Sequence, residues 1–446
     1  MRSYNHVQRE LPCETYQDTW YLKSKNKCVP QLNCQSIYQN VIVNPKVIAN
    51  GLGKQIRTAK FKTSTNLTRD SPSGYPGKTH QEIKNLNLDY KISEKLNGFD
   101  PFTPEDEEFI KIAYIQTKQD DKNGRVVRDE VSDRVNAGLK NLLEFQGNDN
   151  VLEIYGYCNE EIEQTKNKKG ELETVERTIF ISEMCENGDL ASFIGSKTFK
   201  EFDMIERVKL IISFLKTFEF LHNSPTGTRI NCDMNGLHRA LTQFLVTDSF
   251  NVVLNDLDDI PLADKSNRCE WGLSNVIERH PENFRNDTVE DFKDNFLAPE
   301  QMMSDEQFYN LYPEELEKKL EDGQIPTRFD TEKIDIWKIP DMVLSVLTKT
   351  IPTFQQSLDA TKVFFATSDI LKKCKEIDYR LRPTAAEIVE KFEEALQNLE
   401  INRIREYNGS LDDSIRLMKN IDGPFYDDLD RTKLVDQIMS YGKKHL

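Results

Sequence analysis

The pattern of apolar residues changes near Asp203, and this change constrains the fold more than any other feature of the sequence. The residues before Asp203 form short apolar segments typical of strands, around one segment with helical spacing at 128–145. The residues after it form long segments with helical spacing, the first of which opens with a capping pattern of Asp203 and Glu206. We therefore predict an α+β chain with a strand-rich first part and a helical second part.

The length of 446 residues suits a domain of roughly 300 residues with extensions at both ends. The expected parts are a cysteine-containing N-terminal segment at 1–45, a folded domain at 46–400 and a helical tail at 401–446. Within the domain, we expect the strand-rich part at 46–190 and the helical part at 191–400. A polar stretch at 62–103 predicts an inserted loop, and the charged residues 159–173, around Gly170, predict a solvated hairpin loop.

Charge and hydropathy exclude several classes of partner. The chain has 59 basic and 75 acidic residues, and its net charge of −16 disfavours binding to nucleic acid or to anionic lipid. No run of about 18 apolar residues occurs, and the N-terminus shows no apolar signal-peptide segment. We therefore expect no nucleic-acid partner, and membrane association only through an N-terminal anchor that this sequence does not show.

The cysteines and glycosylation sequons leave the redox compartment open. Cys13, Cys28 and Cys34, among 8 cysteines in all, cluster near the N-terminus, which is compatible with disulfide bonds and equally with buried thiols. The N-x-S/T sequons, at a number expected by chance, begin at Asn66, Asn286 and Asn408. The histidines lack metal-ligand spacing and no CxxC pair occurs, so we expect no structural zinc.

The most informative chemical signal is an ordered set of acidic motifs in the second half of the chain. Asp256 ends a predicted strand in NVVLNDLDD, and Asp233 precedes it in INCDMNG. Phosphoryl transfer requires a base for the attacking hydroxyl, carboxylates for Mg²⁺ and cations for the phosphates. An aspartate at a strand end is, alone, more often a turn residue. It gains weight here because three motifs follow in the order found in protein kinases, namely APE with Glu300, DIW with Asp335 and RPT with Arg382.

Long stretches of the sequence resemble the protein O-mannose kinase family, a divergent branch of the protein kinases. The resemblance is densest between residues 220 and 395, in GTRINCDMNGLHRALTQFLVTDSFNVVLNDLDDIPL, FLAPEQ, EKIDIWKIPD and RLRPTAAEI. It is weaker but collinear from 20 to 220, where SKNKCVPQLNC resembles the N-terminal segment of the family. The resemblance implies a bilobal protein kinase-like fold with a small β-rich N-lobe and a larger helical C-lobe.

This resemblance assigns roles to residues of the helical part. Asp233 stands at the place of the catalytic base. Asp256 stands at the place of the metal-binding aspartate, and Gln243 replaces the second metal ligand, because the usual asparagine position is His238 here. The expected structural residues of the kinase motifs are Glu300, Asp335 and Arg382.

The resemblance also implies an ATP site in the strand-rich part. Its expected residues are Gly51, Gly53, Lys54, Asp133 and Glu183. Ile115 occupies the position of the usual kinase lysine, so Lys54 on the second strand would meet the phosphates, with Lys111 as the alternative. The helix acid that pairs with this lysine is either Asp133 or Glu130.

The implied activity is transfer of phosphate from ATP, with Mg²⁺ or Mn²⁺, to the 6-hydroxyl of mannose in the GalNAc-β3-GlcNAc-β4-Man trisaccharide of a glycoprotein such as α-dystroglycan. The implied location is the endoplasmic reticulum or Golgi lumen, or the secretory pathway more generally. Gly236 departs from the family, which tends to carry an acid there, so one substrate contact differs. Two alternatives stay open. They are a pseudokinase scaffold, because the usual lysine and asparagine are missing, and a secreted protein kinase acting on Ser, Thr or Tyr.

Overall fold

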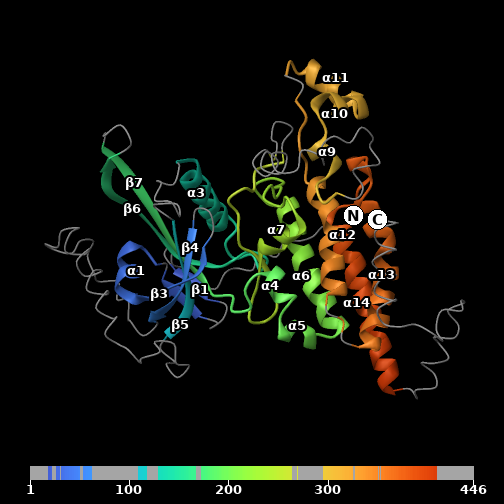
Figure 1. Ribbon diagram of the computed structural model, residues 1–446, viewed down its shortest axis with the longest axis horizontal. Helices are drawn as coiled ribbons and strands as arrows, with labels where there is room; N and C mark the ends of the chain where they lie inside the picture. Colours follow the sequence, from blue (N-terminus) through green and yellow to red (C-terminus); the bar gives the residue numbers. More distant parts are fainter. Residues whose placement is uncertain are drawn as a thin grey trace, which may run out of the picture. The chain divides into compact units, whose positions relative to one another are not determined.

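The computed structural model describes most of the chain between residues 19 and 408. The described residues are 19–22, 27–30, 32–50, 54–62, 109–117, 129–166, 172–263, 269, 295–324, 327–349, 351 and 353–408. They fall into two compact units (Figure 1). The first unit contains the described residues up to 139 and those of 153–184, and the second contains those of 140–152 and from 185 onward. The loop predicted at 62–103 lies outside the described residues, except for Lys62.

An antiparallel sheet of five strands forms the first unit, in the order β3-β4-β5-β7-β6. Its strands are β3 (Val41–Asn50), β4 (Lys54–Lys62), β5 (Phe109–Thr117), β6 (Ile154–Lys166) and β7 (Leu172–Glu183). A separate ladder pairs β1 (Thr19–Leu22) with β2 (Lys27–Pro30). The helices that begin in this unit are α1 (Cys34–Asn40) and α3 (Asp129–Glu144). β3 and β4 pair with each other on either side of Gly51 and Gly53, as the sequence pattern of strand, glycine turn and strand predicts.

Different helices cover the two faces of this sheet. Phe61 and Ile181 project from one face into a buried cluster that includes Ile37 of α1. On β7, the hydroxyl of Thr178 donates to the amide oxygen of Asn136 in α3 at 2.7 Å. Successive residues of a strand point to opposite faces, so Thr178 and Ile181 lie on opposite faces and α1 and α3 do too.

The strands β6 and β7 are longer than the sequence predicts. β6 continues to Lys166 and β7 begins at Leu172, so the ladder includes Glu160 opposite Arg177. The prediction of a solvated loop over 159–173 is therefore wrong on both sides of 167–171, which lie outside the described residues. An antiparallel ladder satisfies the backbone whatever the polarity of its side chains, so charged composition alone did not exclude strands here.

The segment ahead of β3 packs against β6. Leu32 forms a parallel bridge with Gly156, where an added Cβ would lie 2.1 Å from the carbonyl oxygen of Leu32. Cys34 forms a disulfide bond with Cys158. Gly156 is required because the close approach of Leu32 leaves no room for a side chain.

Helices dominate the second unit, which confirms the predicted change from a strand-rich to a helical part. They are α4 (Leu190–Phe193), α5 (Lys197–Glu201), α6 (Met204–His222), α7 (Leu237–Thr242), α9 (Pro299–Met302), α10 (Asp305–Leu311), α11 (Pro313–Glu321), α12 (Lys333–Thr348), α13 (Phe354–Cys374) and α14 (Ala385–Asn408). A short ladder joins β8 (Phe244–Val246) to β9 (Val252–Leu254). None of the helices in the described part of the chain combines the length and hydrophobicity that crossing a bilayer requires.

Helix α6 packs against α12, α14 and β9 and so lies at the core of this unit. The predicted capping box is present at its start, because Glu206 N–H donates to Asp203 Oδ1 at 3.0 Å and Asp203 N–H donates to Glu206 Oε2 at 2.7 Å. An apolar stripe at helical spacing is buried along this helix and comprises Val208, Ile211, Ile212, Leu215 and Phe218. The helix end at His222 leads into the loop that carries Asp233.

The described residues contain two disulfide bonds, Cys34–Cys158 and Cys232–Cys269. Cys185 and Cys374 are buried thiols, so both alternatives that the sequence left open occur in this chain. Disulfide bonds persist in oxidising compartments and are rare in the cytosol. The two bonds therefore favour a lumenal or secreted protein.

Candidate active site

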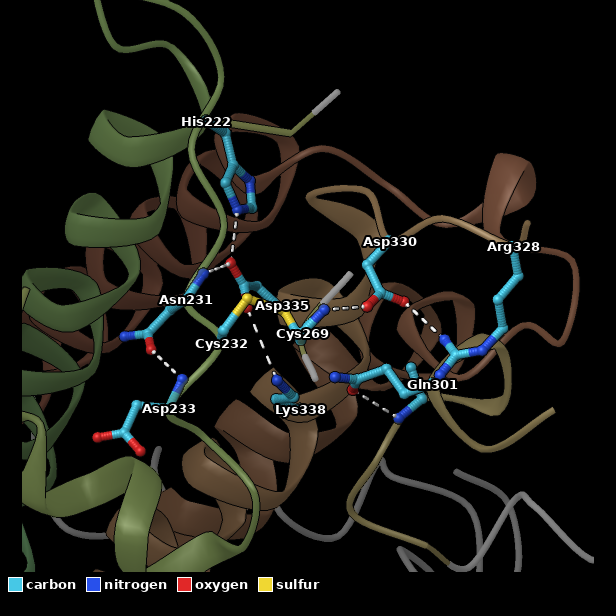
Figure 2. The surroundings of a disulfide bond; sticks show 11 residues. His222, Asn231, Cys232, Asp233, Cys269, Gln301, Arg328, Asp330, Asp335 and Lys338 are labelled. Carbon is cyan, nitrogen blue, oxygen red and sulfur yellow. Dashed lines mark hydrogen bonds and ion pairs between the residues drawn. A yellow bond between two sulfur atoms is a disulfide. The ribbon is translucent and has the colours of Figure 1, made fainter. Parts of the chain in front are cut away.

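The loop between α6 and α7 carries Asp233, and a buried carboxylate of α12 holds this loop in place. The N–H of Asn231 donates to Oδ2 of Asp335 at 3.0 Å, and Nε2 of His222 lies 3.3 Å from the same oxygen. The amide oxygen of Asn231 accepts from the N–H of Asp233 at 3.1 Å. Figure 2 shows the carboxylate of Asp233 pointing away from Asp335 and from the disulfide. The loop is thus anchored on one side and presents its carboxylate on the other.

Two side chains at α7 bind the Asp233 carboxylate. Arg239 forms an ion pair with Oδ2 of Asp233, and Nε2 of Gln243 donates to the same oxygen at 3.2 Å. Arg239 and Gln243 stand four residues apart, at the spacing that places side chains on one face of a helix. The side chain of Asp233 is 16% exposed and that of Arg239 is 52% exposed. One short helix therefore orients the carboxylate while leaving it accessible to a small reactant.

The buried amide of Gln243 keeps one acceptor atom unpaired. Gln243 is 1% exposed, and its Oε1 has no hydrogen-bond partner among the described residues. A carboxylate of Asp233 can only accept, so the amide nitrogen faces it and the amide oxygen faces elsewhere. A buried acceptor without a partner costs free energy until a donor or cation binds it, and amide oxygens are ligands of Mg²⁺. The oxygen of Gln243 therefore fits the metal ligand expected at this position.

The hairpin of β8 and β9 brings Asp256 beside Gln243. The N–H of Asn255 donates to the carbonyl oxygen of Gln243 at 3.0 Å, which extends the ladder by one pair beyond the strands. The turn after Asp256 returns along the Asp233 loop, because the N–H of Cys232 donates to the carbonyl oxygen of Asp259 at 3.0 Å. The segments that carry Asp233 and Asp256 thus lie side by side.

The charges of three carboxylates act on Arg239. Burial lowers the pKa of this guanidinium, but the hydrogen bond to Asp233 and the charges of Asp233, Asp256 and Asp258 outweigh it, so the pKa is raised overall. We call Asp233, Arg239, Gln243, Asp256 and Asp258 the Asp233 site. Among the described residues, no three His, Cys, Asp or Glu side chains form a complete metal cage. Mg²⁺ is commonly bound by one or two carboxylates together with substrate phosphates.

A disulfide bond ties the Asp233 loop to Cys269. Cys232 and Cys269 are each 4% exposed, and Cys232 is the residue directly before Asp233. The N–H of Cys269 donates to Oδ2 of Asp330 at 2.7 Å, and Arg328 lies 3.3 Å from the other oxygen of Asp330 (Figure 2). Burial raises the pKa of Asp330, and the charge of Arg328 opposes this shift. The disulfide is therefore buried beside an ion-paired polar network.

Glu300 and Arg382 form a buried, bidentate ion pair. Nη1 and Nη2 of Arg382 lie 2.5 and 2.8 Å from the two carboxylate oxygens of Glu300. Arg382 also donates to the carbonyl oxygens of Glu376 at 2.8 Å and Lys333 at 2.9 Å. This pair joins the start of α9 to the segment ahead of α14, with both side chains almost fully buried.

The first unit carries the residues expected at the ATP site. Lys54 begins β4 opposite Thr117, and its Nζ lies 6.0 Å from the centre of the Phe180 ring. Ile115, at the usual lysine position, is 2% exposed and pairs with Phe180 across β5 and β7. The buried Ile115 and the amine of Lys54 thus occupy the same region of the sheet.

The other residues expected at the ATP site lie in environments that differ from that of Lys54. Oε1 of Glu183 accepts from the N–H of Glu153 at 2.9 Å, and the N–H of Glu183 donates to the carbonyl oxygen of Glu153 at 2.9 Å. Asp133 of α3 and Lys111 of β5 are exposed. Gly51, Gly53 and the side chain of Glu130 lie outside the described residues.

Sequence reasoning missed two charged residues of this region. Arg239 was not singled out, although its position six residues after Asp233 is close enough for a helix turn to return it to that carboxylate. Lys338 was also missed. It is 0% exposed and lies 3.8 Å from Oδ1 of Asp335. A lysine three residues after an aspartate in an otherwise apolar helix was the available signal.

An antiparallel sheet with one long helix, followed by a helical unit with Asp233, Asp256 and the Glu300–Arg382 pair, is consistent with a protein kinase-like fold. The sequence is similar to the protein O-mannose kinases of Homo sapiens and Macaca fascicularis, each 30% identical over 272 residues, which cover 60% of this chain and 64% of the relative. The protein O-mannose kinase of Xenopus laevis is 29% identical over 261 residues, or 58% of this chain and 61% of the relative. No protein-family model matches the chain.

These similarities confirm the expected resemblance to the protein O-mannose kinase family. The match spans 64% of the length of the first two relatives, which is less than two thirds. The activity, substrate and partners of this chain are therefore matters for proposal.

Proposed function

We propose that this chain is an ATP-dependent kinase of a sugar hydroxyl, namely the 6-hydroxyl of O-linked mannose in the GalNAc-β3-GlcNAc-β4-Man core of a glycoprotein. The observation that carries the proposal is the Asp233 site, where an oriented carboxylate, a buried amide oxygen without a partner and a strand-end aspartate come together. The names of the relatives support a glycan as the acceptor.

Asp233 acts as the general base in this proposal. Its orientation is set by Gln243 and Arg239, and that of its loop by the bond from Asn231 to Asp335. As the acceptor oxygen bonds to the γ-phosphorus of ATP, the bond from that phosphorus to the β,γ-bridging oxygen breaks and ADP leaves with the electron pair. The proton of the hydroxyl moves to the carboxylate of Asp233.

Asp256 and Gln243 are the residues that would hold Mg²⁺ or Mn²⁺. Their fit rests on the unpaired Oε1 of Gln243 and on the hairpin that carries Asp256 beside it. When bound, the metal neutralises charge on the phosphates. The bond from Gln243 Nε2 to Asp233 means that the same side chain orients the base, so the two functions are coupled through one amide.

Lys54 is the proposed phosphate-binding lysine of the strand-rich part, together with Gly51, Gly53, Asp133 and Glu183. Ile115 is buried at the position of the usual kinase lysine, so no charged side chain is available there. This supports Lys54 as the phosphate-binding lysine. Lys54 begins a strand directly after the predicted glycine turn, where an amine can reach a phosphate held by backbone N–H groups. Lys111 remains the alternative.

A lumenal acceptor fits the disulfide bonds of this chain, and we propose the endoplasmic reticulum or Golgi as the compartment. The glycoprotein acceptor would be recognised through its O-linked trisaccharide. Gly236, which precedes α7, leaves nothing within 4 Å of an added Cβ, so this position has space on the side where a substrate contact of the family is expected.

A pseudokinase is the competing function, and the burial of Ile115 at the lysine position is the observation that favours it. A protein of that kind would bind partners through the same fold without phosphoryl transfer. Nucleotide binding without transfer to any acceptor would distinguish it.

Transfer of labelled phosphate from Mg-ATP tests the proposal, with the synthetic trisaccharide and a pool of Ser, Thr and Tyr peptides as separate acceptors. Labelling of the trisaccharide at the mannose 6-hydroxyl is expected. Asp233→Asn should reduce it by about 10²-fold to 10⁴-fold, the range for loss of a general base. Asp248→Asn is the matched control, because Asp248 accepts one backbone hydrogen bond, from Glu186, and lies outside the Asp233 site.

The possible outcomes separate the functions. Peptide labelling without glycan labelling would make the chain a protein kinase, and nucleotide binding without labelling of either acceptor would make it a pseudokinase. Equal loss in Asp233→Asn and Asp248→Asn would remove Asp233 from the role of base.

A further inference from the structure

Arg239 is held differently from two buried arginines of the helical unit, Arg382 and Arg207. The guanidinium of Arg382 makes two bonds to Glu300 and three to backbone carbonyls, and its side chain is 0% exposed. Arg207 is equally buried and donates to the carbonyl oxygens of Phe202 and Lys349. Arg239 bonds to Oδ2 of Asp233 while 52% of its side chain is exposed. Such a half-exposed pair exchanges partners at little cost in free energy.

The partner of Arg239 is Asp233, the proposed base, whose carboxylate must be free to accept the proton of the attacking hydroxyl. A guanidinium that stays on Oδ2 of Asp233 occupies one of the two oxygens that could accept the proton of a hydroxyl. Gln243 donates to the same oxygen and can continue to orient the carboxylate when the arginine leaves. The site therefore contains one fixed and one replaceable donor to the base.

Arg239 lies in surroundings suited to binding a phosphate group of a nucleotide. The charges of Asp256 and Asp258 act on the guanidinium in addition to that of Asp233. Asp256 is proposed to hold the metal that would neutralise the phosphates, and the guanidinium lies within the field of this carboxylate, near the place proposed for the terminal phosphate of ATP. A guanidinium binds phosphate well, because it can donate two parallel hydrogen bonds to the phosphate oxygens.

We propose that Arg239 exchanges the carboxylate of Asp233 for the terminal phosphate of bound ATP, and thereby binds the transferred group and frees the base in one movement. This inference rests on the proposed function, since it assumes that Asp233 and Asp256 face a nucleotide. Arg239 remains protonated throughout and transfers no proton. Its contact is with the γ-phosphate, so it distinguishes ATP from ADP.

Nucleotide binding tests this without any sugar acceptor. Titration calorimetry with Mg²⁺ measures the affinities of the protein for the β,γ-imido analogue of ATP and for ADP. In Arg239→Ala, the affinity for the ATP analogue should fall by about tenfold or more, the effect of losing a hydrogen bond to a charged group. The affinity for ADP should change by less than about twofold, because ADP lacks the γ-phosphate.

Two further variants control the measurement. Arg380→Ala removes another partly exposed arginine that pairs with carboxylates, Asp378 and Glu314, outside the Asp233 site, and should leave both affinities unchanged. Arg239→Lys keeps the charge and should retain most of the preference for the ATP analogue. If Arg239→Ala fails to fold, Arg239→Gln, which keeps the stem and removes the charge, replaces it, and thermal unfolding of each variant establishes that it is folded.

Each outcome decides the inference. Equal weakening of both nucleotides, or no weakening, overturns it. Tighter binding of the ATP analogue also overturns it, because Arg239 would then be a latch on Asp233. If the unaltered protein binds neither nucleotide, this inference and the proposed function fall together. If it binds both with the expected preference but labels no glycan, the role of Arg239 stands and the proposed acceptor is wrong.

Discussion

Lys338 Nζ lies 3.8 Å from Oδ1 of Asp335, and both side chains are 0% exposed. The other oxygen of Asp335 binds the N–H of Asn231 and meets His222, so this pair supports the loop that carries Asp233. Burial lowers the pKa of Lys338, while the charges of Asp335, Asp330, Glu300 and Asp233 oppose the shift. Lys338 thus lies among carboxylates whose charges favour its protonated form.

Removing this amine should destabilise the helical unit. Lys338→Met removes the amine beside the buried carboxylate of Asp335 and leaves His222 as its ion-pair partner, and the free energy of unfolding should fall by about 3–5 kcal/mol. Urea unfolding followed by tryptophan fluorescence measures this. The double variant Lys338→Met with Asp335→Asn should lose less than the sum of the single variants, because no unpaired charge remains. Lys216→Met breaks an exposed pair with Glu393 and should cost less than about 1 kcal/mol. Additive losses in the double variant would show that Lys338 and Asp335 act independently.

Loss of either disulfide bond should lower stability, but only loss of Cys232–Cys269 should also slow phosphate transfer. Replacing either pair with serines is expected to cost about 2–4 kcal/mol in the free energy of unfolding. Only the Cys232–Cys269 pair adjoins Asp233, whereas Cys34–Cys158 joins α1 to β6 in the other unit. The rate of phosphate transfer should therefore fall in Cys232→Ser with Cys269→Ser and stay near normal in Cys34→Ser with Cys158→Ser, measured well below the unfolding temperature of each. Equal rates in the two variants would remove the disulfide from the positioning of Asp233.

Features with local causes could be predicted from the sequence. The capping boxes of Asp203 with Glu206 and of Thr384 with Glu387 involve residues three positions apart, so the pattern contains the whole interaction. The strands around the glycine turn and the buried stripe of α6 follow from periodicity in the same way.

Features that depend on the tertiary arrangement could not be predicted. The partner of Cys232 is 37 residues away and its pairing follows from how two loops meet, which spacing does not determine. The ion pair of Arg239 with Asp233 depends on the direction in which α7 leaves the loop. The charged ends of β6 and β7 were taken for a loop because composition describes side chains, while a ladder is made by the backbone.

Gln243 should determine the metal dependence of nucleotide binding. Gln243→Met keeps the volume of the buried side chain but removes the unpaired Oε1. The Mg²⁺ concentration for half-maximal binding of ATP should rise by about tenfold or more, the effect of disturbing a metal site. Gln301→Met is the matched control, because Gln301 is also buried, at 3% exposed, and its Oε1 accepts from the N–H of Ala298. An unchanged Mg²⁺ requirement in Gln243→Met would exclude this amide as a ligand.

The capping box of α14 should make stability depend on pH through Glu387. Hydrogen bonds from the N–H and hydroxyl of Thr384 hold the pKa of Glu387 below its ordinary value of 4.5. The folded state therefore binds this proton less readily than the unfolded state, so the stabilisation is present above pH 4.5 and is lost as the pH falls through the lower folded value. Glu387→Gln should reduce the free energy of unfolding by about 0.3–1 kcal/mol at pH 7, the range for an acid in the first turn of a helix.

This deficit of Glu387→Gln should shrink toward zero below pH 4.5, where the carboxyl of the unaltered protein takes up its proton. Urea unfolding at a series of pH values from 3 to 7 measures the difference between the two proteins. Glu394→Gln, which alters a carboxylate paired with Lys391 farther along α14, controls for the loss of a surface charge. A deficit that stays constant with pH, or that grows toward acid, would contradict a role for the ionised carboxylate at this helix start.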